Sequence, residues 1–319
     1  MTEIRDTALG SAEIAESDAP ALSVIVVNYN AGRLLTDCVR AVLDSADPIQ
    51  VLVSDNGSSD RSLTELIAQV GHDRRLSIEE NGTNLGFAAA NNRVLALATA
   101  PYLLFLNPDC VVGADTLDKA LAFMDAMPGA GMAGCVIRNP DGTEQKGSRR
   151  AIPNPYIGLL SALHIDRVWP WLASRHRLDR LDQPLPDVPV RVDAISGAFM
   201  LVRRTALDSV GTLDEGYFLH CEDLDWFVRF SRAGWGIYLI PDAEVIHHKG
   251  ACSAAEPVRV AWHKHHGMAR FFRKFQFREY SLPVSIIVLL GIWAHFVVWM
   301  LISGLWRMLG ALRAHADRS

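Results

Sequence analysis

The sequence has few cysteines, and none of them form a C-x-x-C pair. Its five cysteines are an odd number scattered over 319 residues, at positions 38, 110, 135, 221 and 252. Zinc motifs and disulfide frameworks need clustered or paired cysteines, so a zinc site is not expected and the thiols are expected to stay reduced. Residues 1–20 also lack an apolar stretch. We therefore expect no secretory signal there, only a disordered, polar tail.

Positive charge is also scarce over most of the chain. The formal net charge is −5, but residues 262–319 carry +6 and residues 1–261 carry −11. An acidic body argues against nucleic acid as a partner, and a basic, aromatic tail favours a membrane surface. Charged residues are absent from the 27 positions 280–306, a run long enough to cross a bilayer. A single span, a re-entrant pair and an in-plane helix pair all fit this run, as does a buried helix or an oligomer contact.

Short apolar runs alternate with helical patterns through the first half of the chain. Strands are predicted at 22–27, 50–54, 77–80 and 102–106, and helices at 33–43, 63–70 and 88–98. This alternation predicts an α/β fold with parallel strands and crossover helices. Each strand ends in a cluster of Asn, Asp, Gly or Ser. Because ligands bind beyond the carboxyl ends of such strands, a nucleotide is expected at this edge of the sheet.

The pattern weakens in residues 147–190, which contain six prolines. These residues predict a long connection, which is either a mobile lid over a site or a loop with a purely structural role. Order resumes at 192–203, followed by a predicted helix at 215–233 and strands at 236–240 and 245–248. Residues 262–278 then alternate basic and aromatic side chains, which is typical of an amphipathic segment lying on anionic lipid.

Six motifs stand in order along the chain. They are Val26-Val27-Asn28-Tyr29-Asn30, Ser54-Asp55-Asn56-Gly57-Ser58-Ser59-Asp60, Asn84-Leu85-Gly86-Phe87-Ala88-Ala89-Ala90-Asn91, Leu106-Asn107-Pro108-Asp109, Ser196-Gly197-Ala198-Phe199-Met200 and Glu222-Asp223-Leu224-Asp225-Trp226. Over about residues 22–275, this ordered set resembles the family-2 inverting glycosyltransferases of GT-A fold, especially the bacterial rhamnosyltransferase-like branch.

The resemblance implies an α/β, Rossmann-like GT-A domain over residues 21–261, with a mixed sheet flanked by helices. Its nucleotide-sugar half is expected at about 21–146 and its acceptor half at about 190–261, with a membrane-associated helical segment after them. The implied reaction moves a sugar, with rhamnose from dTDP-rhamnose as the expected case, from a dTDP- or UDP-linked donor. The implied acceptor is lipid-linked or a polysaccharide, at the cytoplasmic face of the bacterial inner membrane. A second copy of the chain, in a homo-oligomer, is a further partner to be considered.

The resemblance also assigns residues to the donor. Asp55 matches the residue that hydrogen-bonds the pyrimidine ring, although Asp55 also suits an ordinary turn or helix cap. Asn84 and Gly86 are expected to let the backbone approach the donor closely. The remaining residues expected around the nucleotide are Asn28, Asn30, Asn56, Ser58 and Asn107.

For the metal, Asp109 matches the last acid of the family's D-x-D motif, which implies Mg²⁺ or Mn²⁺ against the diphosphate. Asn107 replaces the first acid, so this site offers one carboxylate where the family pattern has two. One carboxylate together with substrate phosphates is a workable Mg²⁺ site. His247 matches a position that can complete the metal shell, with His248 as the competing choice.

The acidic pair Glu222-Asp223 is expected to supply the general base. Asp223 is assigned as the base, and Glu222 is expected to raise its pKa by like-charge repulsion. Both acids could equally be first-turn residues favoured by the helix dipole. Ser196 and Gly197 are expected beneath the acceptor, and Trp226 is expected either as its platform or as a core residue.

Two other functions fit parts of the sequence. A nucleotide-sugar hydrolase would use the same two carboxylates. A non-catalytic, sugar-nucleotide-binding membrane protein would explain Asn107 as the trace of a decayed metal site.

Overall fold

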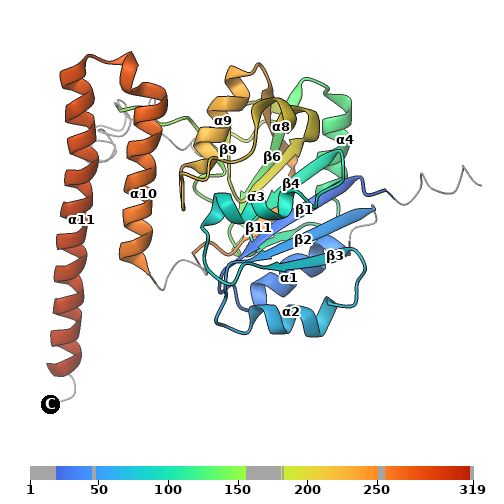
Figure 1. Cartoon of the computed structure of the whole chain (residues 1–319), viewed down its shortest axis with the longest axis horizontal. Helices are drawn as coiled ribbons and strands as arrows, with labels where there is room; N and C mark the ends of the chain where they lie inside the picture. Colours follow the sequence, from blue (N-terminus) through green and yellow to red (C-terminus); the bar gives the residue numbers. More distant parts are fainter. Residues whose placement is uncertain (1–18, 45–47, 156–180, 182, 251–255, 317–319) are drawn as a thin grey trace, which may run out of the picture.

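The computed structural model describes residues 19–44, 48–155, 181, 183–250 and 256–316, with only the backbone described over 305–316. Nearly all of the expected disordered tail 1–20, and most of the lid expected at 147–190, lie outside these ranges. The described chain forms an α/β domain beside a hairpin of two long helices (Figure 1).

A mixed sheet runs through the domain in the order β3-β2-β1-β4-β10-β6-β11-β5. The strands are β1 (Leu22–Asn28), β2 (Ile49–Asp55), β3 (Leu76–Glu80), β4 (Tyr102–Leu106), β5 (Cys110–Val112), β6 (Ala130–Arg138), β10 (Phe199–Arg203) and β11 (Gly236–His247). β8 (Val190–Arg191) pairs with β11, and β7 (Arg149–Arg150) pairs with β9 (Ala194–Ile195) in a separate small sheet. The predicted α/β class with a mixed sheet is confirmed.

Strand direction decides which residues meet at the functional edge. β1 to β4 run parallel, and β10 lies antiparallel between β4 and β6. The carboxyl ends of β1, β2 and β4 therefore meet the beginning of β10 at one edge of the sheet. β1 and β4 are buried along their whole lengths, as expected for continuous apolar runs with helices on both faces.

Helices cover both faces of this sheet. One face packs against α1 (Arg33–Leu43), α2 (Ser62–Val70) and α4 (Thr116–Ala126). The other packs against α3 (Phe87–Leu95), α8 (Arg204–Val210) and α9 (Glu222–Arg232). The predicted helix 33–43 is confirmed residue for residue, and the helices predicted at 63–70 and 88–98 differ from the observed ones only near their ends.

Two predicted elements differ from the structure. The helix expected at 215–233 begins only at Glu222, because His220 and Cys221 have φ angles of 70° and 72°, which no α-helix accommodates. The strands expected at 236–240 and 245–248 form the single strand β11, with a register shift between Ile240 and Glu244. This irregularity lets one strand continue along β6 where the sequence pattern breaks.

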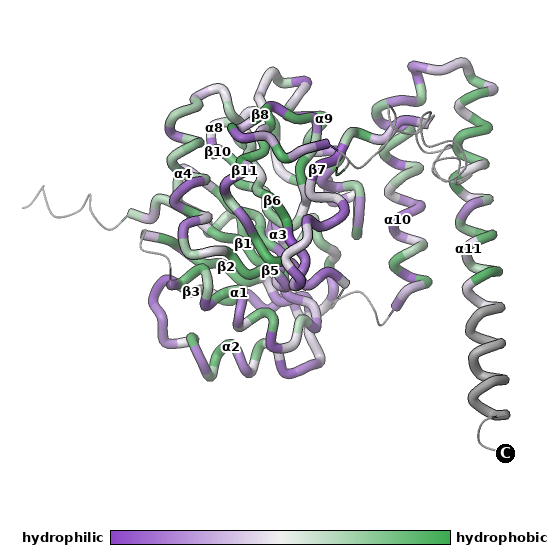
Figure 2. Tube along the Cα trace, turned by 180° about the vertical axis from the view of Figure 1, so that it is seen from behind, coloured by the Kyte–Doolittle hydropathy of each residue, from purple (hydrophilic) through white to green (hydrophobic). Residues whose placement is uncertain are grey.

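The C-terminal segment is a helical hairpin. α10 (Pro257–Phe271) continues through a π-helical turn, η1 (Phe272–Gln276), and a 3₁₀ turn, η2 (Phe277–Glu279), into α11 (Leu282–Ala316). α10 lies between the domain and α11, which runs back alongside it (Figures 1 and 2). By length and composition, residues Leu282–Gly304 of α11 could cross a membrane, and little of this stretch is buried.

Candidate active site

The ends of β1 and β2 are joined by buried polar side chains. Asn28 and Asp55 are register partners, and the Asn28 Nδ2 atom donates to Asp55 Oδ1 over 2.7 Å. The second carboxylate oxygen of Asp55 accepts the backbone N–H groups of Gly57 and Ser58, over 3.1 and 3.0 Å. Asp55 is only 3% exposed. In this structure its carboxylate shapes the loop after β2, and its expected contact with a pyrimidine stays a prediction.

Asn30 and Ser58 belong to the same network. Asn30 has a φ of 54°, and its Oδ1 atom accepts the backbone N–H groups of Ser59 and Asp60, over 2.8 and 3.2 Å. Ser58 Oγ in turn accepts the backbone N–H of Asn30 over 3.0 Å. Four of the residues expected around the nucleotide, namely Asn28, Asn30, Asp55 and Ser58, are therefore brought together by direct hydrogen bonds.

The loop before α3 is held against these strand ends. Buried Asn56 donates from Nδ2 to the Gly86 carbonyl over 3.2 Å, and Asn84 Oδ1 accepts the Gly86 N–H over 3.0 Å. Gly86 has a φ of 87°, and a Cβ atom there would lie 2.6 Å from the Phe218 carbonyl oxygen. The close approach at Gly86 is therefore made by Phe218, in the loop before α9, and the Phe87 N–H donates to the same carbonyl over 2.8 Å.

Asp109 and His247 face each other across the β5–β11 pair. Cys110 is the register partner of His247, which brings the preceding Asp109 Oδ1 within 3.1 Å of His247 Nε2. Ligand atoms of Asp109, Cys110 and His247 lie within 4.8 Å of one another, and all three residues are buried. The structure thus turns the imidazole of His247 toward Asp109, whereas His248 contributes its backbone N–H to the Asp109 carbonyl, over 2.9 Å.

Gln145 fixes how His247 is presented, a role that the sequence did not reveal. Its Nε2 atom donates to the His247 carbonyl over 3.0 Å and to Asn139 Oδ1 over 2.9 Å, so its Oε1 atom is the one that faces His247 Nδ1, at 2.7 Å. His247 Nδ1 therefore donates to Gln145, and Nε2 is the ring nitrogen that faces Asp109. An imidazole nitrogen and a carboxylate oxygen 3.1 Å apart are both metal-ligand atoms, so this donor set fits a divalent metal.

The thiol of Cys110 is less suited to that metal. Burial, together with the negative charge of Asp109, raises the pKa of the Cys110 thiol well above its usual value. Its Sγ atom lies 3.6 Å from the Ala198 carbonyl oxygen and donates to it. Hard cations such as Mg²⁺ prefer oxygen ligands, so Asp109 and His247 are the better candidates for holding the ion.

Asp223, in the first turn of α9, is held by an arginine that the sequence did not single out. The Arg150 guanidinium, on β7, donates to Asp223 Oδ2 and to the Ile195 carbonyl, the latter over 2.9 and 3.2 Å. A Cβ atom on Gly197 would lie 2.9 Å from the same Asp223 oxygen. The turn before β10 therefore needs a glycine where it passes the carboxylate, so Gly197 of the expected Ser196-Gly197 floor lies beside Asp223.

Glu222 has a different environment from its neighbour. It is 8% exposed, and its Oε2 atom has no hydrogen-bond partner among the described residues. Burial and then the charge of Asp223 raise the pKa of Glu222 to about 8. The expectation that Glu222 supports Asp223 as the base stays a prediction. What distinguishes the two neighbours in this structure is the hydrogen bond that Arg150 donates to Asp223.

Trp226 is a core residue, so of its two expected roles the core one is confirmed and the acceptor platform is wrong. Its side chain is fully buried, with the ring edge-on to Phe105 at 4.9 Å and to Phe230 at 5.4 Å between centroids. Its Nε1 atom donates to the Gly211 carbonyl over 2.9 Å. No face of the indole is left for a sugar, because the apolar stripe of α9 turns toward the sheet.

Known proteins resemble this chain in sequence. The family model described as "Glycosyl transferase family 2" matches residues 23–211. The N-acetylglucosaminyl-diphospho-decaprenol L-rhamnosyltransferase of Mycobacterium tuberculosis is 32% identical over 253 residues, which cover 74% of this chain and 78% of the relative. The rhamnosyltransferase WbbL of Escherichia coli is 26% identical over 232 residues, 70% of this chain and 82% of the relative.

A solved structure shares the fold. The mannosyltransferase PcManGT from Pyrobaculum calidifontis, in complex with GDP-Man and Mn²⁺, superposes with a TM-score of 0.55. The match covers 92% of this chain and 80% of that protein at 18% sequence identity. At that identity the similarity shows a common architecture.

Proposed function

This chain belongs to glycosyl transferase family 2, and from that premise we propose that it moves a rhamnosyl group from dTDP-rhamnose onto a lipid-linked acceptor, with inversion at the anomeric carbon. Two relatives that match most of the chain are named as rhamnosyltransferases. The name of one of them specifies an acceptor linked through a diphosphate to decaprenol. The observation that carries the proposal is the meeting of three elements at one sheet edge, namely the polar strand ends, the Asp109–His247 pair and the Glu222-Asp223 pair.

The two acids divide the proton chemistry between them. In a direct displacement the acceptor hydroxyl forms the new glycosidic bond, the bond to the departing diphosphate breaks, and a base takes the hydroxyl proton. A base must also be held in position, and the guanidinium of Arg150 holds the carboxylate of Asp223 in place. Glu222, with its raised pKa, stays protonated beside it near neutral pH. Environments that separate two neighbouring acids in this way favour Asp223 as the base.

The departing diphosphate would be stabilised by a metal ion. Asp109 and His247 are the residues that would hold Mg²⁺ or Mn²⁺, and the bound ion would neutralise the departing diphosphate. The Nε2 atom of His247, which faces Asp109 at 3.1 Å, supports this assignment. Around the donor nucleotide we place the residues of the strand-end loops, which are Asn28, Asn30, Asp55, Asn56, Ser58, Asn84, Gly86 and Asn107.

The acceptor side follows from the same arrangement. Gly197 leaves room beside the carboxylate of Asp223, so Ser196 and Gly197 are proposed to lie beneath the acceptor hydroxyl. The apolar helix α11, long enough to cross a membrane, supports a reaction at a membrane surface, and a nucleotide sugar made in the cytoplasm would require the cytoplasmic face.

The test is a transfer assay on the purified full-length chain. Nucleotide sugars including dTDP-rhamnose, UDP-glucose and UDP-N-acetylglucosamine would be offered with a polyprenyl-diphosphate-linked sugar, with Mg²⁺, with Mn²⁺ or with chelator. We expect metal-dependent transfer from dTDP-rhamnose, detected by mass spectrometry, with the inverted anomer by NMR. Asp223→Asn is the matched inactive control.

Two outcomes would contradict the proposal. Free sugar released at the same rate without acceptor would favour the nucleotide-sugar hydrolase. Nucleotide-sugar binding without turnover, unchanged in Asp223→Asn, would favour a non-catalytic binding protein.

A further inference from the structure

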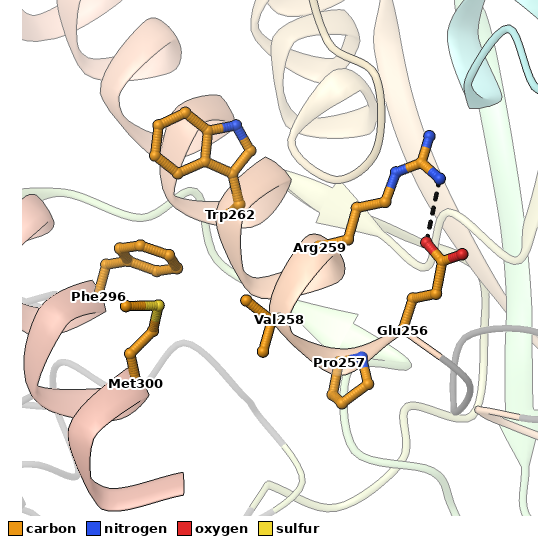
Figure 3. A pocket seen from close by; sticks show the side chains of 7 residues that line it. All are labelled: Glu256, Pro257, Val258, Arg259, Trp262, Phe296 and Met300. Atoms are coloured by element: carbon orange, nitrogen blue, oxygen red, sulfur yellow. Dashed lines mark hydrogen bonds and ion pairs between the residues drawn. The ribbon is translucent and has the colours of Figure 1, made fainter. Parts of the chain in front are cut away.

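An apolar groove lies between α10 and α11, outside the site described above. Its volume is about 670 Å³. Its walls are formed by Pro257, Val258 and Trp262 of α10 and by Phe296 and Met300 of α11 (Figure 3). Trp262 packs against Phe296, with 5.7 Å between ring centroids. Apolar walls of this kind favour the binding of a hydrocarbon chain.

Charge is confined to the rim of the groove that faces the domain. Glu256 and Arg259 form an ion pair there, over 3.0 Å, and both side chains are about half exposed. Arg259 also lies over the ring of Phe218, 5.3 Å from its centroid. A guanidinium at the end of an apolar groove suits a ligand that has a hydrocarbon chain and a phosphate head.

Phe218 contacts both the rim of the groove and the loop at Gly86 beside the candidate active site. The Phe218 ring stacks on His263 of α10 with centroids 4.2 Å apart, and its carbonyl oxygen contacts the loop at Gly86 and accepts the Phe87 N–H. Arg259 and His263 therefore touch the residue that joins the acceptor half to the donor loop. One aromatic side chain separates the groove rim from the strand-end edge.

The opposite face of α10 packs on the turn that carries the acids. A Cβ atom on Gly267 would lie 2.6 Å from the His220 carbonyl and 3.4 Å from Cys221 Cβ. His220 and Cys221 have positive φ and directly precede Glu222. The helix that lines the groove thus also supports the catalytic turn, so the groove and the acids keep a fixed relation.

We propose that this groove binds the isoprenoid chain of the lipid-linked acceptor, with the acceptor diphosphate at Arg259 and its sugar lying past Phe218 toward Asp223. The inference rests on the proposed function and adds the place where the acceptor lipid is held. α11 supplies the apolar side of the groove and could itself enter a bilayer, so a membrane-borne chain reaches the groove without crossing water. A phospholipid acyl chain has similar chemistry, but it would not account for the link from the rim through Phe218 to the acids.

The first test fills the groove. Met300→Trp adds bulk to its wall, and Val298→Trp adds similar bulk on the exposed side of α11, where Val298 is 52% exposed. Both variants are assayed with a long-chain polyprenyl-diphosphate-linked sugar and with a short-chain analogue bearing the same head. We expect Met300→Trp to raise the KM for the long-chain acceptor at least tenfold, with kcat and the short-chain KM unchanged. Val298→Trp should match wild type.

The second test does not need turnover, so it separates failure of the groove from failure of the proposed function. A photoreactive long-chain polyprenyl diphosphate is crosslinked to the full-length protein in detergent, and the labelled peptides are identified by mass spectrometry. Labelling of the groove that polyprenyl diphosphate competes away, and that Met300→Trp reduces, supports the proposal. Equal competition by an anionic phospholipid, labelling confined to the outer face of α11, or equal behaviour of the two tryptophan variants would overturn it.

Discussion

The guanidinium of Arg150 lies on the carboxylate of Asp223. Arg150 comes from β7, at the start of the proline-rich connection, and also donates to the Ile195 carbonyl of the paired strand β9. The side chain of Asp223 is 12% exposed, so an unpaired charge there would be costly. This contact distinguishes Asp223 from Glu222, two acids that are adjacent in the sequence.

Replacing Arg150 should therefore slow transfer. In Arg150→Met the carboxylate of Asp223 loses the cation that holds it in place, so kcat in the transfer assay should fall about tenfold or more. Arg150→Lys should recover part of the loss. Arg149→Met is the control, because Arg149 pairs with Glu144 over 2.8 Å. An unchanged kcat in Arg150→Met would contradict this role.

Glu222 should make the folded state less stable as pH rises. Its folded pKa of about 8 lies above its usual value, so no penalty exists at low pH, where the acid is neutral in both states. As the pH rises from the usual carboxyl pKa to the folded pKa, the free energy of unfolding falls. The reason is that over this range Glu222 ionises in the unfolded state but stays protonated in the folded state. Glu222→Gln should therefore be more stable than wild type at pH 9, on the order of 2–5 kcal/mol, and nearly equal at pH 5. Urea unfolding at the two pH values checks this, and an equal difference at both would count against it.

The carboxylate of Asp109 should be indispensable for metal binding. Asp109→Ala should abolish metal-dependent transfer and Mn²⁺ binding by calorimetry, whereas Asn107→Asp should preserve both because it restores a second carboxylate. Cys110→Ser is the control, since the thiol is neutral and donates to the Ala198 carbonyl. Full activity in Asp109→Ala would remove the basis of the metal assignment.

Gln145 should act on the metal through His247. Gln145→Leu removes the acceptor that keeps the proton on Nδ1, so Mn²⁺ affinity should fall about 10–100-fold. Gln145→Glu keeps an acceptor at this position and should retain most of the affinity. Calorimetric titration with Mn²⁺ measures the change directly, and equal affinities for all three proteins would show that Gln145 only supports the fold.

Gly86 offers a test of the contact between the two halves. In Gly86→Ala the alanine is strained at the φ of 87°, and its methyl group, 2.6 Å from the Phe218 carbonyl oxygen, must also displace that carbonyl. Gly82→Ala, at a φ of 70° with nothing nearby, has only the backbone cost, about 1 kcal/mol. Thermal unfolding should show a larger loss for Gly86→Ala, and transfer should fall only in that variant. Similar losses of stability in the two variants would show that the loop carrying Phe218 moves away from Gly86 at little cost.

The sequence by itself determined the layered fold and the nature of its functional edge. Apolar runs such as Tyr102–Leu106 are strands because their side chains are buried on both faces, and polar residues such as Asn28 and Asp55 end them. These signals are local, so they can be read from neighbouring residues. They placed the donor loops and the metal acid at one edge of the sheet, whereas the acidic pair was assigned from the resemblance to a known family.

Only the tertiary structure decided which side chains act on one another there. The β5–β11 register turned His247 rather than His248 toward Asp109, and Gln145 met His247 across 102 positions. Arg150 reached Asp223 across 73 positions, and burial beside Asp223 raised the pKa of Glu222. Trp226 went into the core because α9 packs its apolar face on the sheet. Such contacts depend on β10 lying between β4 and β6 and on the loops that follow, and no local periodicity records them.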